Sequence, residues 1–217
     1  MSARPPAGRA GGGEPVFAGL DGEMSGPDPG IHRLIQIGVA LDDDAAFCSR
    51  IGWSDCRYEP DALAAIGLDP ADLAEGPPCE EVDERLHRWL VGHGAAEGTV
   101  IPVGWGVSGF DMPFVVATLP RSHRLLSHRS VELNAVCHTF DGVLLGRDGP
   151  ATAEAWKQRS KQEAERRLED ELGLAPAWHD AGYDARASLA AWRWLRGALA
   201  AGSSGAEIGP RQAPERV

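Results

Sequence analysis

The sequence has no uninterrupted apolar run of about 18 or more residues, the length that a membrane-spanning helix requires. Its opening segment, MSARPPAGRAGGGEP, also lacks the apolar core of a secretory signal. We therefore expect a cytoplasmic protein that does not act at a membrane.

Cysteine is scarce. The chain has four, at Cys48, Cys56, Cys79 and Cys137, and they form no C-x-x-C pair and have no histidine at zinc spacing. This pattern favours reduced structural thiols over disulfides or a zinc site.

Acidic residues outnumber basic ones: the chain has 32 Asp and Glu against 21 Lys and Arg, which gives a formal net charge of −11. An extended footprint on duplex nucleic acid depends on many basic contacts to phosphate, so the charge disfavours that kind of binding. It leaves room for one small nucleic-acid site that works through bound cations, because cations reverse the local potential.

The length of 217 residues suits one domain with a sizeable core. Residues 1–14 are rich in Gly, Pro, Ala and Arg, which predicts a disordered tail. We expect the folded domain to cover residues 15–198 and a flexible tail to cover residues 199–217.

Within the domain, strands and helices alternate. The periodicity predicts strands at 16–20, 35–41, 46–53, 99–103 and 131–133, the first two forming a hairpin, with a turn at 42–44. It predicts two short helical pieces in 60–74, helices at 80–91, 111–119, 152–172 and 181–200, and a further helix after the strand at 131–133. The helix at 152–172 carries interleaved charges, so a solvated surface helix is favoured over one whose basic residues contact phosphates, namely Lys157, Arg159, Lys161 and Arg166.

Acidic residues interrupt this pattern where apolar ones are expected. Asp21 and Glu23 end the first strand and, with a period of two, point to the same face. Neighbouring carboxylates repel and ionise poorly near a core, so a divalent cation is the simplest partner for them. The alternative is an ordinary charged end of a hairpin.

Three further polar residues stand at element boundaries. Asp111 follows a glycine-rich segment and, taken alone, suits a helix N-cap. Asp184 lies on the margin of the core-facing arc of the helix at 181–200, and His179 falls in the loop before that helix.

The ordered set Asp21-x-Glu23, Gly-Phe-Asp111 and His179-x-Ala-x-x-Asp184 resembles the DEDDh branch of the ribonuclease-H-like 3′-to-5′ exonuclease superfamily. The resemblance implies an α/β fold, a ribonuclease-H-like mixed β-sheet flanked by α-helices. It also implies two divalent cations, Mg²⁺ or Mn²⁺, held by four carboxylates. Asp21 would bridge the two ions, Glu23 and Asp184 would hold one, Asp111 would act on the other through water, and His179 would serve as the general base.

The resemblance is closer to oligoribonucleases over residues 15–198, which would then form an exonuclease domain. It is carried by the segments EMSG after Asp21, LPRSHRLLSHRSVEL from Leu119, and DARASLA from Asp184 into RWLR. Three features depart from the family: Gly106 and Val107 stand where Asn is frequent, Gln36 stands where an acid is frequent, and residues 140–177 are longer and more charged.

Substrate contacts are also implied by the resemblance. Met24 would slide between the last two bases, although core packing explains it equally well. Apart from the resemblance, Ser25 and Gly26 are candidates to offer backbone N–H groups to the 3′ hydroxyl. His128 and Arg129 resemble a phosphate-contacting pair in a site completed by a second subunit of a homodimer, and the alternative is that they are exposed loop residues.

Aromatic residues near the acids offer surfaces on which bases can stack. The candidates are Trp105, Phe110 and Tyr183, with a core position the more natural interpretation of Phe110.

The predicted activity is two-metal-ion 3′-to-5′ hydrolysis of single-stranded RNA or DNA ends, or of short oligonucleotides. The sequence does not choose between ribose and deoxyribose. The alternatives are a DNA proofreading or trimming exonuclease of the same superfamily and a catalytically inactive nucleic-acid-binding relative.

Overall fold

The computed structural model describes residues 15–41, 45–139 and 150–202. The expected tails at 1–14 and 203–217, and the expected turn at 42–44, lie outside the described residues. Helix α7 continues to Gly202, past the expected domain boundary at 198.

A five-stranded mixed sheet forms the centre, in the order β3-β2-β1-β4-β5. The strands are β1 (Val16–Met24), β2 (Leu34–Ala40), β3 (Ala46–Arg50), β4 (Val100–Gly104) and β5 (Val131–Glu132). The first three are antiparallel neighbours, as the hairpin prediction requires, and β4 runs parallel to both β1 and β5. Strand β1 does not stop before its acidic residues but continues through them to Met24.

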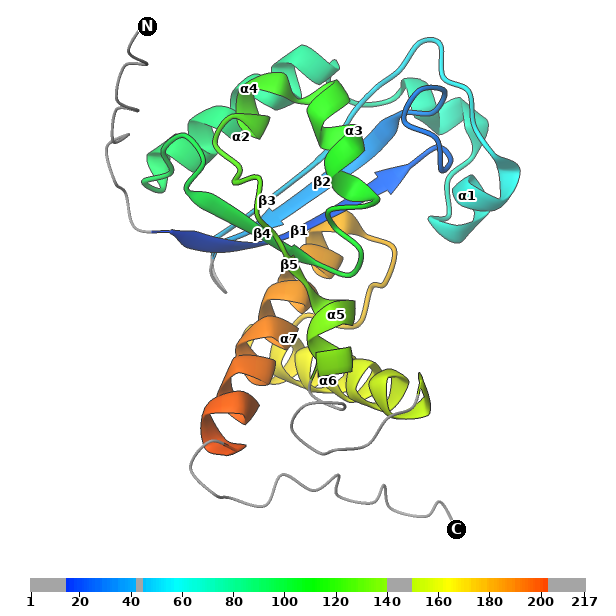
Figure 1. Ribbon diagram of the computed structural model, residues 1–217. Helices are drawn as coiled ribbons and strands as arrows, with labels where there is room; N and C mark the ends of the chain where they lie inside the picture. Colours follow the sequence, from blue (N-terminus) through cyan, green and yellow to red (C-terminus); the bar gives the residue numbers. More distant parts are fainter. Residues whose placement is uncertain (1–14, 42–44, 140–149, 203–217) are drawn as a thin grey trace, which may run out of the picture.

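Helices cover both faces of the sheet (Figure 1). On one face lie α2 (Cys79–Gly92), α3 (Asp111–Thr118) and α4 (Pro120–His123), the last not expected from the sequence. On the other lies α7 (Ala181–Gly202), with α6 (Pro150–Leu172) and α5 (Leu133–Thr139) beside it. Two short pieces, α1 (Pro60–Ala65) and the 3-10 helix η1 (Pro70–Ala74), lie beyond one end of the sheet. The ribonuclease-H-like α/β prediction is confirmed.

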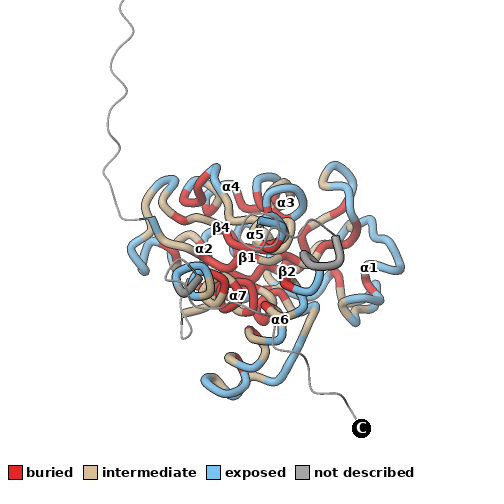
Figure 2. The backbone as a smooth tube through the Cα atoms, turned by 60° about the horizontal axis from the view of Figure 1, so that its bottom comes forward, coloured by how far each residue is buried: buried red, intermediate tan, exposed pale blue. Residues whose placement is uncertain are grey.

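Buried residues lie along the strands and the segments packed on them, and exposed residues lie at the periphery (Figure 2). The two faces of the sheet are packed differently. The face beneath α2 and α3 is filled by large buried side chains, among them Leu20, Leu34 and Phe114. The face beneath α7 has two glycines where such side chains would stand. A Cβ on Gly38 would lie 1.8 Å from the carbonyl oxygen of Ala181, and one on Gly19 would lie 1.9 Å from that of Ala185. The backbone of α7 therefore rests directly on β1 and β2.

Helix α6 is not the solvated surface helix that its charges favour. Trp156, Ala164 and Leu168 are buried on its inner side, in one cluster with Leu195 of α7 and Cys137 of α5. Its charges occupy the outer side, where Arg166 pairs with Glu163 and Asp170. Among the described residues, no helix has both the length and the apolar character needed to cross a bilayer.

Candidate active site

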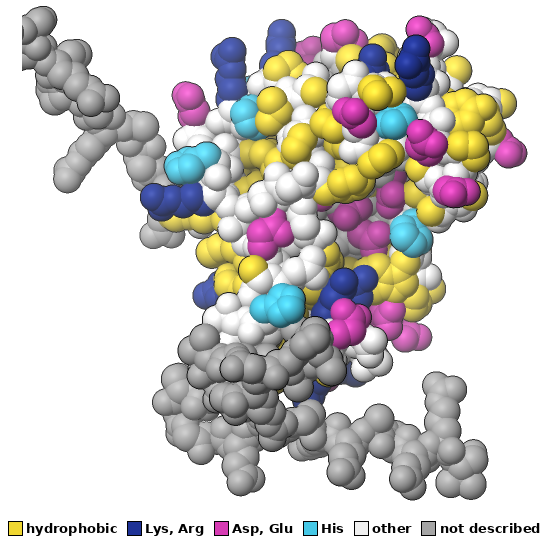
Figure 3. Space-filling model, turned by 45° about the vertical axis from the view of Figure 1, so that its right-hand side comes forward, with side chains coloured by type: hydrophobic (Ala, Val, Ile, Leu, Met, Phe, Trp, Pro, Cys, Tyr) yellow, Lys and Arg dark blue, Asp and Glu magenta, His cyan; other side chains and the backbone are white. Residues whose placement is uncertain are grey.

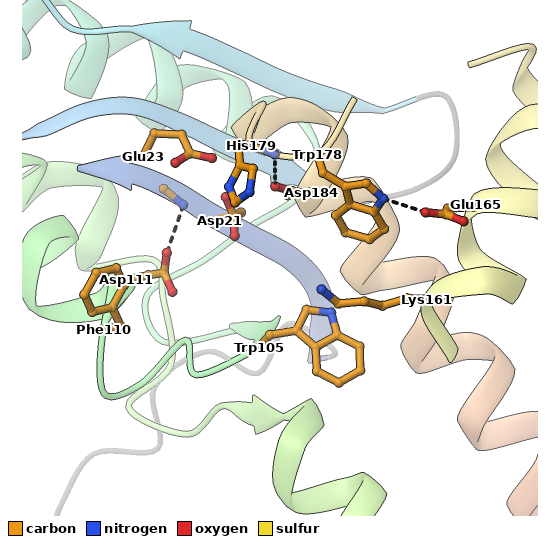
Figure 4. Close-up of a pocket in the computed structure, with 11 residues that line it drawn as sticks. Asp21, Glu23, Trp105, Phe110, Asp111, Lys161, Glu165, Trp178, His179 and Asp184 are labelled. Carbon is orange, nitrogen blue, oxygen red and sulfur yellow. Dashed lines mark hydrogen bonds between the residues drawn. The ribbon is translucent and has the colours of Figure 1, made fainter. Parts of the chain in front are cut away.

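A cleft of roughly 380 Å³ opens where the end of β1 meets α3, α6 and α7. Acidic side chains gather in a recess on this face of the molecule (Figure 3), and the residues around the cleft point toward one another (Figure 4). The cleft is lined by Asp21, Gly22, Glu23, Trp105, Phe110, Asp111, Lys161, Glu165, Trp178, His179 and Asp184. All five residues expected to be catalytic are in this set.

Asp21 and Glu23 occupy alternate positions of β1 and so share the face on which α7 lies. Asp21 stands opposite Gly38 in the β1–β2 register, at the point where α7 touches the sheet. The register shifts between Glu23 and Met24, so β1 is irregular just after its second acid.

Asp111 is not a helix N-cap, since it is the first residue of α3 and Phe110 holds the cap position without a side-chain bond. Its carboxylate instead accepts the backbone N–H of Gly22 at 2.9 Å. This bond joins α3 to β1 between the two acids of that strand, and it holds a buried carboxylate at the cleft.

Asp184 lies in the first turn of α7 and accepts the backbone N–H of His179 at 2.9 Å. His179 has a φ of 68°, a left-handed backbone that only a few per cent of non-glycine residues adopt. Ligand atoms of Glu23, His179 and Asp184 all lie within 4.8 Å of one another. Acidic side chains far apart in sequence therefore meet around one imidazole.

The carboxylates bind protons more tightly than isolated ones do. Burial, reinforced by the charges of Asp184 and Asp111, raises the pKa of Glu23 to about 8. Burial also raises the pKa of Asp111 to about 7 and that of Asp184 to about 6. The pKa of Asp21 lies well above its usual value because it is buried and faces the other three acids. Such a cluster favours positive charge between its members.

The donor set fits hard divalent cations. Mg²⁺ and Mn²⁺ prefer oxygen ligands, and each of the four acids supplies a carboxylate. Oδ1 of Asp184 is buried and has no hydrogen-bond partner among the described residues, so an oxygen atom is free for a ligand.

The opposite wall of the cleft comes from α6 and the loop that follows it. Lys161, Glu165 and Trp178 line this wall, and the indole N–H of Trp178 donates to Glu165. Lys161 is one of the four basic residues of this helix that contact phosphates in the less favoured interpretation of its sequence. The amphipathic arc of Trp156, Ala164 and Leu168 is the signal in the sequence that one side of α6 packs inward.

Met24 and Phe110 border a second, mainly apolar recess beside the acids. This apolar recess, of roughly 230 Å³, is lined by Gly22, Glu23, Met24, Gly26, Pro27, Ala62, Ala65, Ile66 and Phe110. Met24 is buried with the core cluster and also forms part of the recess wall. Core packing and a contact with the terminal bases are therefore compatible roles for this side chain. Phe110 is 46% exposed, and the expectation of a core position for it is wrong.

Ser25 cannot offer its backbone N–H to a substrate in this structure. That N–H donates to the carbonyl of Arg33 at 2.9 Å, and the Ser25 hydroxyl donates to the carbonyl of Arg57. Ser25 therefore anchors the β1–β2 turn. Gly26 lines the apolar recess and packs against the ring of His32.

The remaining substrate candidates divide between the cleft and other places. Trp105 lines the cleft. Tyr183 is buried and packs edge-on against Trp178, so it has no free face on which a base can stack. His128 and Arg129 are exposed between α4 and β5 and do not line the cleft.

No protein-family model matches the sequence, and no curated protein does. Solved structures do match. E. coli exonuclease I in complex with single-stranded DNA aligns with a TM-score of 0.59 at 16% identity, over 89% of this chain and 43% of that one. Exonuclease I from Methylocaldum szegediense aligns with a TM-score of 0.58 at 20% identity, over 84% and 40%. The chain has the fold of these exonucleases. It spans about two fifths of their length.

Proposed function

We propose that this protein is a metal-dependent 3′-to-5′ exonuclease that hydrolyses phosphodiester bonds at the ends of single-stranded or short oligonucleotides. The observation that carries the proposal is the meeting of Asp21, Glu23, Asp111 and Asp184 with His179 in one cleft. The fold shared with exonuclease I supports the same reaction class.

The carboxylates would hold two divalent cations, as the resemblance to DEDDh exonucleases implies. When bound, two such ions neutralise charge on the phosphate and the leaving oxygen and promote ionisation of a water. Asp111 and Asp184 are each held by a backbone N–H, from Gly22 and His179. They therefore keep their positions without an ion, which reduces the ordering required when one binds.

His179 would accept the proton of the attacking water. Its imidazole stands within 4.8 Å of carboxylate oxygens of Glu23 and Asp184, and its side chain is exposed to solvent at the mouth of the cleft. The exposure lets the proton leave to bulk water after the reaction. The bond from its own backbone to Asp184 fixes the loop from which the ring extends.

A short substrate suits the charge and shape of the site. The apolar recess adjoins the acids through Gly22, Glu23 and Phe110 and would receive the terminal base. With a net charge of −11, the rest of the protein offers little attraction to a long strand. We therefore propose oligoribonuclease-like preference for short oligonucleotides.

A second candidate is an exonuclease that trims single-stranded DNA, favoured by the crystallised complexes of exonuclease I with single-stranded DNA and with a dT13 oligonucleotide. Digestion of matched 5′-labelled RNA and DNA, from dinucleotides to about 24-mers, with Mg²⁺ or Mn²⁺ separates the two. Products that shorten stepwise from the 3′ end support the proposal, and the rates rank sugar and length. A purified protein that digests none of these substrates with either ion would be an inactive binding relative.

The resemblance to oligoribonucleases also implies a homodimer whose partner brings His128 and Arg129 to the cleft. Light scattering on the purified protein tests the oligomeric state. A monomer with full activity would remove these two residues from the proposed site.

A further inference from the structure

The wall formed by α6 carries a lysine between two tryptophans. The ammonium of Lys161 lies 4.5 Å from the ring centroid of Trp178 and 5.7 Å from that of Trp105 (Figure 4). Both distances are within the range of a cation–π contact. We call these three residues the α6 clasp. Lys161 is the one Lys or Arg among the described residues that line the cleft.

The clasp is held in place from behind. Glu165, one turn along α6, accepts the indole N–H of Trp178. The inner side of α6 is packed against α7 through Trp156 and Leu168. Trp105 and Trp178 both pack against this same cluster, so the fold sets the positions of the two rings.

Two polar groups of the clasp, the indole N–H of Trp105 and the ammonium of Lys161, have no acceptor among the described residues. The indole nitrogen of Trp105 is buried and has no hydrogen-bond partner among the described residues. Among the described residues, Lys161 has no ion pair or hydrogen bond. Its positive charge nevertheless lowers the pKa of Asp21 and Asp184, against the larger effect of burial. A buried donor without an acceptor is unfavourable, and an anionic oxygen would satisfy the clasp.

The order of features along the cleft indicates which phosphate of a bound strand would supply this anionic oxygen. The apolar recess lies beside Glu23 and Phe110, the carboxylates are central, and the clasp lies beyond Asp21 and Asp184 (Figure 4). A strand whose last base enters the recess and whose scissile phosphate meets the acids has its next nucleotide available for the clasp.

We propose that the α6 clasp binds the nucleotide on the 5′ side of the scissile bond. Lys161 contacts its backbone phosphate, and Trp178 with Trp105 provides indole faces for its base. This inference rests on the proposed exonuclease function. The clasp would then bind only ligands of at least two nucleotides. It would bind them without sequence specificity, since every base has a face that can stack on an indole.

The competing explanation is that Lys161 only offsets the charge of the acids. The two explanations differ in which ligands they affect. Loss of a contact to the second nucleotide weakens binding of dinucleotides and longer strands and spares a 5′-mononucleotide. Loss of charge compensation alone changes mononucleotide binding as much as binding of the longer strands.

The test measures binding of thymidine 5′-monophosphate, a 5′-phosphorylated dithymidine dinucleotide and a 5′-phosphorylated pentanucleotide by tryptophan fluorescence or calorimetry, with Ca²⁺ in place of Mg²⁺ to slow turnover. For Lys161→Ala we expect about 10-fold weaker binding of the two longer ligands, as for loss of a charged hydrogen bond, and unchanged binding of the mononucleotide. Trp178→Ala should weaken the same ligands about 10-fold, and Trp178→Phe should recover part of the loss.

Lys157→Ala is the matched control. Lys157 lies one turn earlier on α6 and 5.9 Å from the Trp105 ring centroid, but it does not line the cleft. This variant should bind all three ligands as the wild type does, and circular dichroism checks that every variant is folded.

Equal weakening of the mononucleotide and the longer ligands in Lys161→Ala, measured at saturating Ca²⁺, overturns the inference in favour of charge compensation. A wild-type protein that digests oligonucleotides while Lys161→Ala binds them unchanged also overturns it and leaves the proposed function standing. A wild type that neither binds nor digests any strand overturns the proposed function itself.

Discussion

The two walls of the cleft are built by different means. The acid wall, β1 with α3 and α7, is fixed by backbone contacts: glycines let α7 rest on the sheet, and two backbone N–H groups hold carboxylates. The α6 wall is fixed by side chains, through Trp156, Leu168 and the bond between Glu165 and Trp178.

The difference indicates how each wall responds to change. Backbone contacts leave no freedom to repack, so the acid wall should tolerate little substitution. Side-chain packing can be rearranged at modest cost when volume is kept. We infer that the acid wall determines the reaction, and that the α6 wall adjusts which strand is held.

The largest effect should come from removing charge from the acid wall. Asp21→Asn keeps the shape of the side chain but weakens a ligand that the resemblance assigns to both ions. We expect hydrolysis of oligonucleotides to fall at least about 10³-fold, because electrostatic stabilisation of the transition state usually contributes most of the rate enhancement in such sites. Single-turnover rates on a labelled pentanucleotide measure it.

Glu80→Gln, on the first turn of α2 across the sheet, is the control and should keep full activity. If Asp21→Asn also kept full activity, Asp21 and Glu23 would be no more than the charged end of a hairpin.

Gly38→Ala tests the backbone contact of the acid wall. The new Cβ would lie 1.8 Å from the carbonyl oxygen of Ala181, so α7 must move and carry Asp184 with it. We expect the free energy of unfolding to fall by roughly 3 kcal/mol, measured by urea denaturation, with a parallel loss of activity.

Gly197→Ala on the exposed part of α7 is the matched control. A Cβ there meets nothing within 4 Å, and alanine favours a helix over glycine by up to about 1 kcal/mol. Unchanged stability in Gly38→Ala would mean that α7 does not rest tightly on the sheet.

His179→Asn tests the residue between the two walls. Asparagine tolerates the left-handed backbone of this position, so the loop should keep its shape. We expect turnover to fall about 10²-fold through loss of the general base, with cation affinity little changed. Calorimetric Mn²⁺ binding beside the rate measurement distinguishes a lost base from a lost ligand, and full turnover in this variant would rule out His179 as the base.

The smallest effect should be the pH dependence of stability without cations. The acid-wall carboxyls have a raised pKa in the folded protein, about 8 for Glu23 and about 7 for Asp111. The folded state then binds more protons than the unfolded chain, so the free energy of unfolding should fall as pH rises from about 4 to about 8. Thermal unfolding in a chelator across this range measures the fall.

Added Mg²⁺ should raise the melting temperature most at the high end of this range, because the ion competes with protons for the same oxygens. Asp21→Asn should flatten the dependence. A melting temperature that rises with pH in the chelator would contradict the electrostatics inferred for the acid wall.

Much of the fold follows from local patterns in the sequence. The antiparallel hairpin of β1 and β2, the buried strand β4 and the long helix α7 all appear where periodicity predicts them. Strand β1 is longer than predicted, because its acids lie within the strand, and a pattern of alternating apolar residues ends at the first of them.

The sequence predicts some residues of the candidate site and not the contacts or burial of others. Asp111 alone suits a helix cap, and only the structure shows its carboxylate on the N–H of Gly22. Phe110 and Tyr183 illustrate the same limit in opposite directions: the apolar residue is exposed and the polar one is buried. Burial depends on which elements pack together, which a single segment of sequence does not encode.

The sequence by itself determined which side chains are available at this site, since the ordered carboxylates offer oxygen ligands and the histidine offers a group that can accept a proton wherever they meet. Only the tertiary structure decided what faces them. Helix α6 carries charges of both signs around much of its surface, so its sequence allows either a solvated helix or a wall of the cleft. Its packing on α7 turns Lys161 toward the acids, and that choice depends on contacts between segments that lie apart in the chain.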